Sequence, residues 1–371
     1  MKSAQGGFFK VAAIVAAATV GDGVFALPYV FMQSGWLVGL FYLVVLAVFV
    51  SAAHVVYLKT LEKIGERERL LGLVKQYFGR GGFWVGFVAI VLGLLLTLVA
   101  YLILGMQFIH LAFPSVAMGV ALLVFWLFTA ITVFASDRRV VKLELVGITC
   151  TSAIIIFIFV TAWPSITFAG VPAINFQNLF LPFGAILFAL AGWTSVEPAY
   201  ESRKKTGALS DPWRALAGGT FFVALLYMLF TSGILGSAPT IASDTISGLT
   251  QWPVWKKEIL VLFGLLAVAT VYMPVSHEIK NALEHDLGWS KFASRSLILF
   301  LPVILIGLGL NNFLVVVGLV GGLFISVQYL LIISIGRRVL ALSAAKKFFL
   351  DLVAAIFVIA AVYEAWTFVV H

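Results

Sequence analysis

The sequence predicts an all-α polytopic membrane protein, and three observations support this fold class. Of the 371 residues, 62% are hydrophobic and only 11% are charged, and the mean hydropathy is +1.11. A soluble domain of this length would need many more charged side chains to cover its surface. Apolar segments long enough to cross a bilayer recur along the whole chain, with no polar domain among them. We therefore predict a single transmembrane domain over residues 1–371.

Eleven apolar stretches have about the 20 residues that a membrane-spanning helix needs. They cover residues 8–33, 36–60, 82–110, 116–135, 141–162, 183–202, 213–236, 258–279, 293–310, 313–336 and 348–369. The first stretch is so long that it spans only as a bent or broken helix. The N-terminal MKSAQGGFFK leads into it without an obvious cleavage site, so we expect a retained first helix rather than a signal peptide.

Basic residues alternate between the two sides of this arrangement. With eleven spans, 22 of the 24 Lys and Arg residues lie on the side that holds the N-terminus, and only Lys256 and Lys257 lie on the other. The positive-inside rule then places the N-terminus in the cytoplasm and the C-terminus outside. The expected location is a prokaryotic cytoplasmic (cell inner) membrane. The net charge of +8 is a topology signal and does not indicate nucleic-acid binding.

The first span is interrupted in its middle. Gly21, Asp22 and Gly23 stand there, and Pro28 follows five residues later. Glycine weakens a helix, and an ionisable side chain at mid-membrane depth is costly unless it has a function. Unwound backbone is tolerated in a bilayer only where it is buried in protein or lines a cavity.

The sixth span is interrupted in a similar way. It contains Gly192, Trp193, Thr194 and Ser195, followed by Glu197 and Pro198. These two spans begin two units of five spans, residues 8–162 and 183–336, with 348–369 as an extra eleventh helix. Because five is odd, the second unit enters the membrane from the opposite side, which predicts an inverted repeat. Interrupted helices at matching places in inverted halves indicate the binding site of a transporter.

The chemistry of two such breaks suits an α-amino acid. The N-terminal ends of the half-helices present free N–H groups and a positive dipole end to a carboxylate. The carbonyl groups of the unwound backbone accept from an ammonium group or bind a cation. The structural alternative is that the glycines serve close helix packing and the prolines only kink the helices.

Several motifs resemble the amino acid/auxin permease family of the amino acid–polyamine–organocation superfamily. The run GDGVFALPYVFMQSGW (21–36) is similar to the first helix of that family, and FALAGWTSVEPAYE (188–201) to its sixth. The segments TGALSDPWRALAGGTFFVALLYMLFTSGILG (206–236), KNALEHDLGW (280–289) and NNFLVVVGLVGGL (311–323) resemble later parts. The order and spacing of these motifs make the resemblance specific, and together they extend over nearly the whole chain.

The resemblance implies the five-plus-five inverted-repeat (LeuT-like) fold and amino acid transport coupled to protons or sodium. In this fold spans 1, 3, 6, 8 and 10 surround the substrate, and spans 1, 2, 6 and 7 rock against spans 3, 4, 5 and 8. It also implies that backbone groups of Gly21, Asp22, Gly23 and of Gly192, Trp193, Thr194, Ser195 hold the substrate, and we add Phe25 to the expected contacts. Sodium-dependent relatives bind the ion between the first and eighth helices, where this chain offers the Gly21 backbone and Thr270. Some proton-coupled relatives have a lysine in the fifth span, where this chain has Gly147.

Asp22 departs from the family pattern, which has a small neutral residue at this position. It is interpreted either as a helix cap for the N–H groups of Val24 and Phe25, or as a functional group. As a functional group it binds the substrate amine, ligates a cation, or carries a proton whose release is tied to transport. These roles remain open at the level of the sequence.

The other polar residues of the spans also have two interpretations each. Glu197 contacts the substrate or pairs with cytoplasmic cations, and Glu144 forms a salt bridge at its helix end or relays protons. Trp193 closes over the substrate as a lid or fills space. His277 and Glu278 mark a wet helix end or a ligand site, and His54 and His110 are expected to be packing or interfacial residues. The acidic residues near the breaks weakly favour a cationic or polar amino acid.

Other classes of function lack their signatures. The five histidines form no H-x-x-x-H or H-E-x-x-H motif, so we expect no enzyme, no metal site and no cofactor beyond a coupling Na⁺ or H⁺. A channel would favour a repeated filter or rings of like charge. The expected partners are an amino acid and the lipid bilayer, not nucleic acid. The alternative function is a carrier of another small metabolite, a polyamine or a drug on the same fold.

Overall fold

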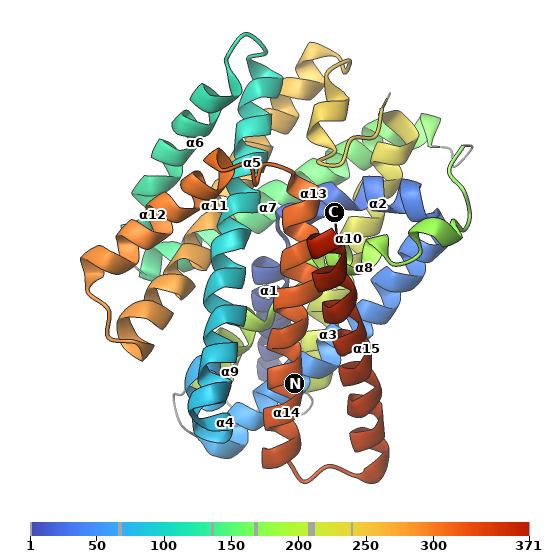
Figure 1. Ribbon diagram of the computed structural model, residues 1–371. Helices are drawn as coiled ribbons and strands as arrows, with labels where there is room; N and C mark the ends of the chain where they lie inside the picture. The colour runs from blue at the N-terminus through green and yellow to red at the C-terminus, as the bar shows by residue number, and fades with distance from the viewer. Residues whose placement is uncertain are drawn as a thin grey trace.

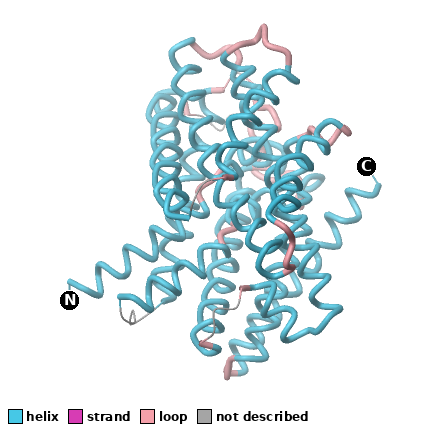
Figure 2. The backbone as a smooth tube through the Cα atoms, turned by 90° about the vertical axis from the view of Figure 1, so that its left-hand side faces the viewer, coloured by secondary structure: helices cyan, strands magenta, loops and turns pink. Residues whose placement is uncertain are grey.

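The computed structural model describes residues 2–65, 69–134, 137–166, 170–206, 212–238 and 240–370. Within these ranges all regular elements are helical (Figures 1 and 2). The α-helices are α1 (Lys2–Thr19), α2 (Leu27–Ser34), α3 (Trp36–Ile64), α4 (Leu70–Phe87), α5 (Gly93–Ala112), α6 (Met118–Val133), α7 (Asp137–Ala162), α8 (Leu181–Leu190), α9 (Val196–Thr206), α10 (Pro212–Ser237), α11 (Val254–Asn281), α12 (Lys291–Gly307), α13 (Phe313–Gly318), α14 (Ser326–Val339) and α15 (Ala344–Val370). Short 3₁₀- or π-helical turns are η1 (Asp22–Ala26), η2 (Val88–Leu92), η3 (Trp163–Ser165), η4 (Phe176–Asn178), η5 (Trp193–Ser195), η6 (Ile246–Leu249), η7 (Ala282–Asp286) and η8 (Leu319–Ile325).

The predicted class of an all-helical polytopic membrane protein is confirmed. Six helices of the described chain are long and apolar enough to cross a membrane alone: Trp36–Ile64, Leu70–Ala112, Trp213–Ser237, Val254–Glu284, Phe313–Val339 and Ala344–Val369. A bent pair, Phe8–Thr19 with Asp22–Ser34, qualifies as a seventh span. All eleven predicted stretches contain helix, but α6 and Val146–Ala162 are shorter, so the count of eleven spans and the inverted repeat stay predictions.

Glycines end or bend the helices at three places between the two breaks in the sequence. Gly35 (φ 98°) separates α2 from α3, and Gly65 (φ 73°) ends α3 in the left-handed conformation that glycine adopts without strain. Gly79 (φ 66°) interrupts α4, so its first turns form a separate arm before the long helix that continues into α5. This arm occupies part of the link between α3 and the long helix, and residues 66–68 of this link lie outside the described chain.

Small residues let the helices approach closely around the centre of the bundle. A Cβ on Gly184 of α8 would lie 2.7 Å from the carbonyl oxygen of Gly318, so α8 packs directly on α13 and the π-helix η8. Helix α1 packs along α10, while α11 packs between α5 and α7. In Figure 2 the two termini lie at opposite sides of the molecule. This packing buries both interrupted helices in the middle of the protein.

Candidate functional site

The first break lies between α1 and η1. The helix ends at Thr19, Gly21 is extended (φ −146°, ψ −160°), and the two halves of the pair are bent by 54°. The freed N–H of Gly21 donates to the hydroxyl of Tyr227 on α10 at 3.2 Å. The same hydroxyl lies 2.8 Å from the Thr19 carbonyl and 3.0 Å from the Ala189 carbonyl at the end of α8. Tyr227 therefore satisfies backbone groups that the break releases and joins the first break to the second.

The second break lies between α8 and α9. Gly192 leaves the helix (φ −149°, ψ 21°), and η5 follows it. The N–H and the hydroxyl of Ser195 both donate to the Gly192 carbonyl, at 3.0 and 2.5 Å. The Gly192 amide interacts with the hydroxyl of Tyr329 on α14. As at the first break, a buried tyrosine on another helix supports the unwound glycine.

The two breaks lie against each other, and glycine is required at the contact. A Cβ on Gly23 would lie 2.6 Å from Cα of Ala189, closer than real Cβ atoms approach backbone. A Cβ on Gly192 would meet Oγ1 of Thr19. The predicted pairing of the two interrupted helices is therefore present in the described chain.

A cavity of about 80 Å³ lies where the breaks meet. A buried water needs roughly 10–15 Å³ of such space, so the cavity has room for a small solute. Its polar lining comes from Thr19, Asp22, Thr97, Tyr101, Trp193, Thr194 and Gln328, and its apolar lining includes Leu94, Phe188, Val271, Val275, Val320 and Ile325. Asp22 and Trp193 are each 3% exposed and Gln328 is 1% exposed. These three polar side chains are thus withdrawn from bulk water.

Asp22 is one of the residues that line this cavity. It is the first residue of η1 and not its cap, which is Gly21, and its carboxylate interacts with the backbone amides of Asp22 and Gly23. The oxygen Oδ2 is buried and has no hydrogen-bond partner. An unpaired buried carboxylate oxygen is costly, and it marks a position where a donor or a cation binds.

Trp193 is held in place by Gln328 on α14. Its indole Nε1 donates to Oε1 of Gln328 at 2.5 Å, and Nε2 of Gln328 donates to the Ala89 carbonyl in η2 at 2.7 Å. The π-helical turn η2 provides this carbonyl, as π-bulges often do at functional sites. The ring that was predicted to be a lid or a filler is thus a fixed wall of the cavity in this conformation.

The remaining predicted residues are distributed between the cavity and its surroundings. Gly21, Gly23, Gly192 and Thr194 line the cavity, whereas Phe25, Ser195 and Glu197 do not. The ring of Phe25 packs edge-to-face on Phe108 and Phe230, at 5.4 and 5.3 Å between centroids. Thr270 and Glu144 stand in α11 and α7, and their side chains lie outside the described part of the structure.

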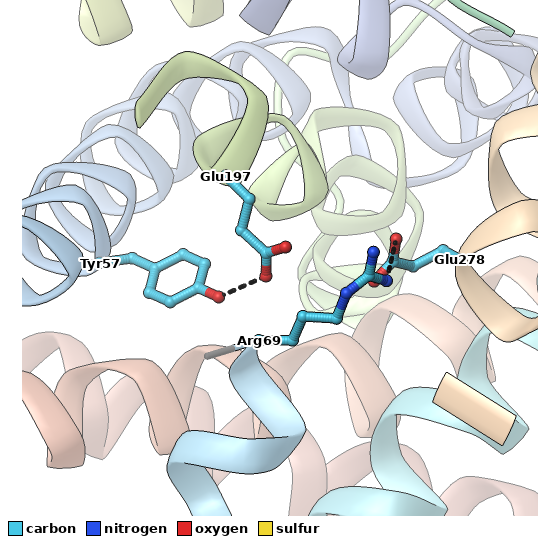
Figure 3. A network of polar contacts seen from close by, with 4 residues as sticks. All are labelled: Tyr57, Arg69, Glu197 and Glu278. Atoms are coloured by element: carbon cyan, nitrogen blue, oxygen red, sulfur yellow. Dashed lines mark hydrogen bonds and ion pairs between the residues drawn. The ribbon is translucent and has the colours of Figure 1, made fainter. Parts of the chain in front are cut away.

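A polar network lies at the far side of the second break (Figure 3). Tyr57 of α3 donates to Oε1 of Glu197 at 2.7 Å, and Nη1 of Arg69 lies 3.4 Å from Oε1 of Glu278 on α11. Figure 3 shows the Arg69 side chain extending between the two glutamates, and it interacts electrostatically with both. We call Tyr57, Arg69, Glu197 and Glu278 the inner network. It connects α3, α9, α11 and the start of α4.

Sequence reasoning missed the residues that support the breaks. Tyr227, Gln328 and Tyr329 come from helices far away in the sequence, and His54, assigned to packing, bonds to Tyr329 at 3.0 Å beside Gly192. The available signal was that each is a polar side chain inside an apolar span, which is costly without a role. Their partners follow only from the fold.

Comparison with known proteins identifies the family. A sequence profile described as transmembrane amino acid transporter protein matches residues 4–363. The chain belongs to this family. The family predicted from the motifs is thereby confirmed, and the protein is an integral membrane transporter. A search of curated proteins gives no match.

Solved structures of other transporters share the fold of this amino acid transporter family member. A manganese transporter from Eremococcus coleocola, in complex with an aromatic bis-isothiourea compound, is similar with a TM-score of 0.62 and 14% identity, over 96% of this chain and 85% of that chain. The nucleobase-cation-symport-1 family transporter Mhp1, in a closed conformation with bromovinylhydantoin bound, has a TM-score of 0.55 and 12% identity, over 97% and 93%. At these identities the likeness concerns the fold alone.

Proposed function

We propose that the protein is a secondary active transporter of amino acids that holds its substrate in the cavity between the two breaks. The observation that carries this proposal is that Asp22, whose Oδ2 is buried and has no hydrogen-bond partner, lines a small cavity between the two breaks. Family membership and the fold of the neighbouring structures support transport, and the donor and acceptor groups of the cavity support the substrate class.

Asp22 binds the α-amino group of the substrate in this proposal. An ammonium group supplies the hydrogen-bond donor that Oδ2 lacks, and charge-assisted bonds in a site shielded from water are strong. The substrate carboxylate lies at the other break, where the half-helix η5–α9 begins at Trp193. The start of a helix offers free N–H groups and a positive dipole end, and an anion binds there for this reason.

The rest of the cavity suits a small neutral side chain. Leu94, Val271, Val275, Val320 and Ile325 form apolar walls around the space that remains. Glu197 lies outside the cavity and is bonded to Tyr57, so it adds no charge to the site. The proposed substrate is therefore a small neutral amino acid such as L-alanine, in place of the cationic or polar substrate that the acidic residues suggested.

The transport cycle is alternating access in an eleven-span, five-plus-five arrangement with a cytoplasmic N-terminus. The bundle of spans 1, 2, 6 and 7 moves against spans 3, 4, 5 and 8, and exposes the site to one side at a time. In this cycle the inner network, which joins α3 to α9 and the start of α4 to α11, is the group of contacts that closes the cytoplasmic path. An ion gradient drives the cycle if the ion binds one conformation better than the other.

The test is uptake by the purified protein in liposomes. A panel of radiolabelled amino acids is measured by counterflow without a gradient, then under an imposed proton gradient and an imposed sodium gradient. Saturable counterflow of a small neutral amino acid, with accumulation under one gradient, supports the proposal. Folded protein that exchanges no amino acid contradicts it and favours a carrier of another metabolite, polyamine or drug.

A further inference from the structure

His54 is a fully buried histidine beside the second break. It lies in the middle of α3 and is 0% exposed. A Cβ on Gly192 would lie 3.5 Å from Cε1 of His54, so the imidazole lies close to the unwound backbone. The proposed function gives this side chain no role so far.

Only one of the two ring nitrogens of His54 has a hydrogen-bond partner. Nε2 lies 3.0 Å from the hydroxyl of Tyr329, and Nδ1 has no hydrogen-bond partner. The amide of Gly192 interacts with the same Tyr329 hydroxyl. A hydroxyl has one proton and two acceptor positions, so it accepts from Gly192 and donates to Nε2 in the arrangement that satisfies most groups. Nδ1–H then remains the one unpaired donor.

Among the described residues, no charged side chain bonds to His54. The described titratable side chains on the helices packed against α3 come from four helices, while α8 has none. They are Tyr29 on α2, Glu197, Tyr200, Glu201, Arg203 and Lys204 on α9, Arg214 and Tyr227 on α10, and Tyr329, Arg337 and Arg338 on α14. Tyr329 is the group that contacts His54. An imidazolium here would lack a fixed counter-charge and would be stabilised by an anion that enters the site.

We propose that His54 is the proton-binding residue of the transport cycle and that the substrate carboxylate supplies its counter-charge. The proposal rests on the proposed function, which places the carboxylate at the start of η5. The neutral imidazole takes one proton from a hydronium ion of the solvent at Nε2, which leaves a water molecule, and becomes an imidazolium. Nε2–H then donates to the Tyr329 oxygen, and the Tyr329 proton turns to the carboxylate oxygen beside Gly192.

Binding of the proton and binding of the substrate therefore strengthen each other. Opposite charges attract strongly in a site without bulk water, so each binds more tightly when the other is present. Linkage makes this effect reciprocal: protonation raises the affinity for the substrate, and the substrate raises the affinity for the proton. A carrier whose proton and substrate bind as a pair is a symporter.

A polar line along α3 leads from His54 towards the inner network. Ser51, His54, Tyr57 and Thr60 recur every third residue, and each is at most 1% exposed. Residues three apart are neighbours on a helix surface. Tyr57 bonds to Glu197, which places a carboxylate beyond the histidine on the cytoplasmic side. When the substrate leaves inward, the imidazolium loses its counter-charge and releases its proton along this side.

Calorimetric titration of the purified protein with L-alanine tests the proposal without any gradient. Measured in buffers of different ionisation enthalpy, the parent takes up about one proton per L-alanine bound. Its affinity for L-alanine rises about tenfold per unit fall in pH over the range in which His54 is neutral in the free protein and protonated in the complex. His54→Gln, which keeps a polar partner for Tyr329, binds L-alanine without proton uptake and without this pH dependence.

Two further variants keep the test decisive. His110→Gln is the matched control, because Nδ1 of His110 already bonds to the Val116 carbonyl at 3.0 Å, and it behaves as the parent. If His54→Gln does not fold, Tyr329→Phe replaces it, since Phe keeps the stacking on Phe357 and removes only the hydroxyl. Proton uptake of Tyr329→Phe then falls well below one.

The outcomes separate the two proposals. Unchanged proton uptake in folded His54→Gln, or in Tyr329→Phe where that variant stands in, overturns the role of His54. L-Alanine binding by the parent without proton uptake also overturns it and leaves the proposed function intact. Absence of L-alanine binding by the parent contradicts the proposed substrate class itself, and the role of His54 falls with it.

Discussion

Nη1 of Arg69 lies 3.4 Å from Oε1 of Glu278, and this ion pair joins the segment before α4 to the inner part of α11. Arg69 also interacts electrostatically with Glu197, which Tyr57 holds from α3. One cation thus serves two carboxylates from helices that are proposed to move apart when the cytoplasmic side opens. Because Arg69 is a cation between two carboxylates, removing its positive charge and removing one of the negative charges are expected to have opposite effects.

Arg69→Ala is expected to weaken the closed conformation by about 1–2 kcal/mol. The side chains of Arg69 and Glu278 are 32% and 23% exposed, so the cost lies between that of an exposed pair and that of a buried one. The variant leaves two carboxylates facing each other, and adding Glu278→Gln removes one of them. The double variant therefore regains part of the loss in thermal unfolding midpoint and counterflow rate. If the losses caused by Arg69→Ala and by Glu278→Gln simply add in the double variant, in both the unfolding midpoint and the counterflow rate, the electrostatic role is contradicted.

Asp22→Asn is expected to weaken substrate binding by about 1.5–3 kcal/mol, which is roughly 10- to 150-fold in affinity. The amide keeps the shape of the side chain but loses the charge that holds the substrate ammonium. Binding of L-alanine to the purified variant measures the effect. If the variant binds normally and exchanges substrate but no longer accumulates it, Asp22 is a coupling residue and not the amine ligand.

Gly23→Ala is expected to block transport while leaving the protein folded. The new Cβ would lie 2.6 Å from Cα of Ala189, so the two breaks must separate, at about 1–3 kcal/mol. Gly119→Ala is the matched control, because a Cβ there meets nothing within 4 Å. Counterflow and the unfolding midpoint are compared for both variants. Full activity of Gly23→Ala would mean that the close contact of the breaks is not required.

Gln328→Leu is expected to release Trp193 and to lower stability by about 1–3 kcal/mol. The substitution leaves the indole N–H and the Ala89 carbonyl buried without partners. The tryptophan fluorescence of the variant shifts and its affinity for substrate falls, whereas Gln251→Leu, at an exposed turn, changes neither. An unaltered affinity in Gln328→Leu would show that Trp193 needs no support from α14.

The two breaks were predictable from the sequence because they depend on local chemistry. Gly21 to Gly23 and Gly192 interrupt apolar runs, and glycine at mid-membrane depth is visible without knowledge of the fold. The family was predictable for a similar reason, since its motifs surround these glycines. The count of spans is less direct, because α6 and the broken segment α8–α9 fall short of the length of a simple transmembrane helix.

The supporting residues were not predictable because their roles depend on long-range contacts. Tyr227 meets Gly21 across 206 positions and Tyr329 meets His54 across 275. Phe25 is the opposite case, a residue close to a break in the sequence that does not line the cavity. It follows the break directly in the sequence, but the 3₁₀ turn of η1 directs its ring to Phe108 and Phe230 and away from the cavity. Proximity in sequence to a break therefore does not predict contact with the substrate.

The central claim is that the cavity between the breaks binds both charges of an amino acid. Equilibrium binding of L-alanine to the purified protein, in competition with ethylamine and with propionate, tests it most directly. The account predicts that L-alanine binds while either single-charge analogue competes at least about a hundredfold more weakly, since each lacks one of the two charged groups that the cavity holds. Equal competition by either analogue, or absence of L-alanine binding to folded protein, would contradict it.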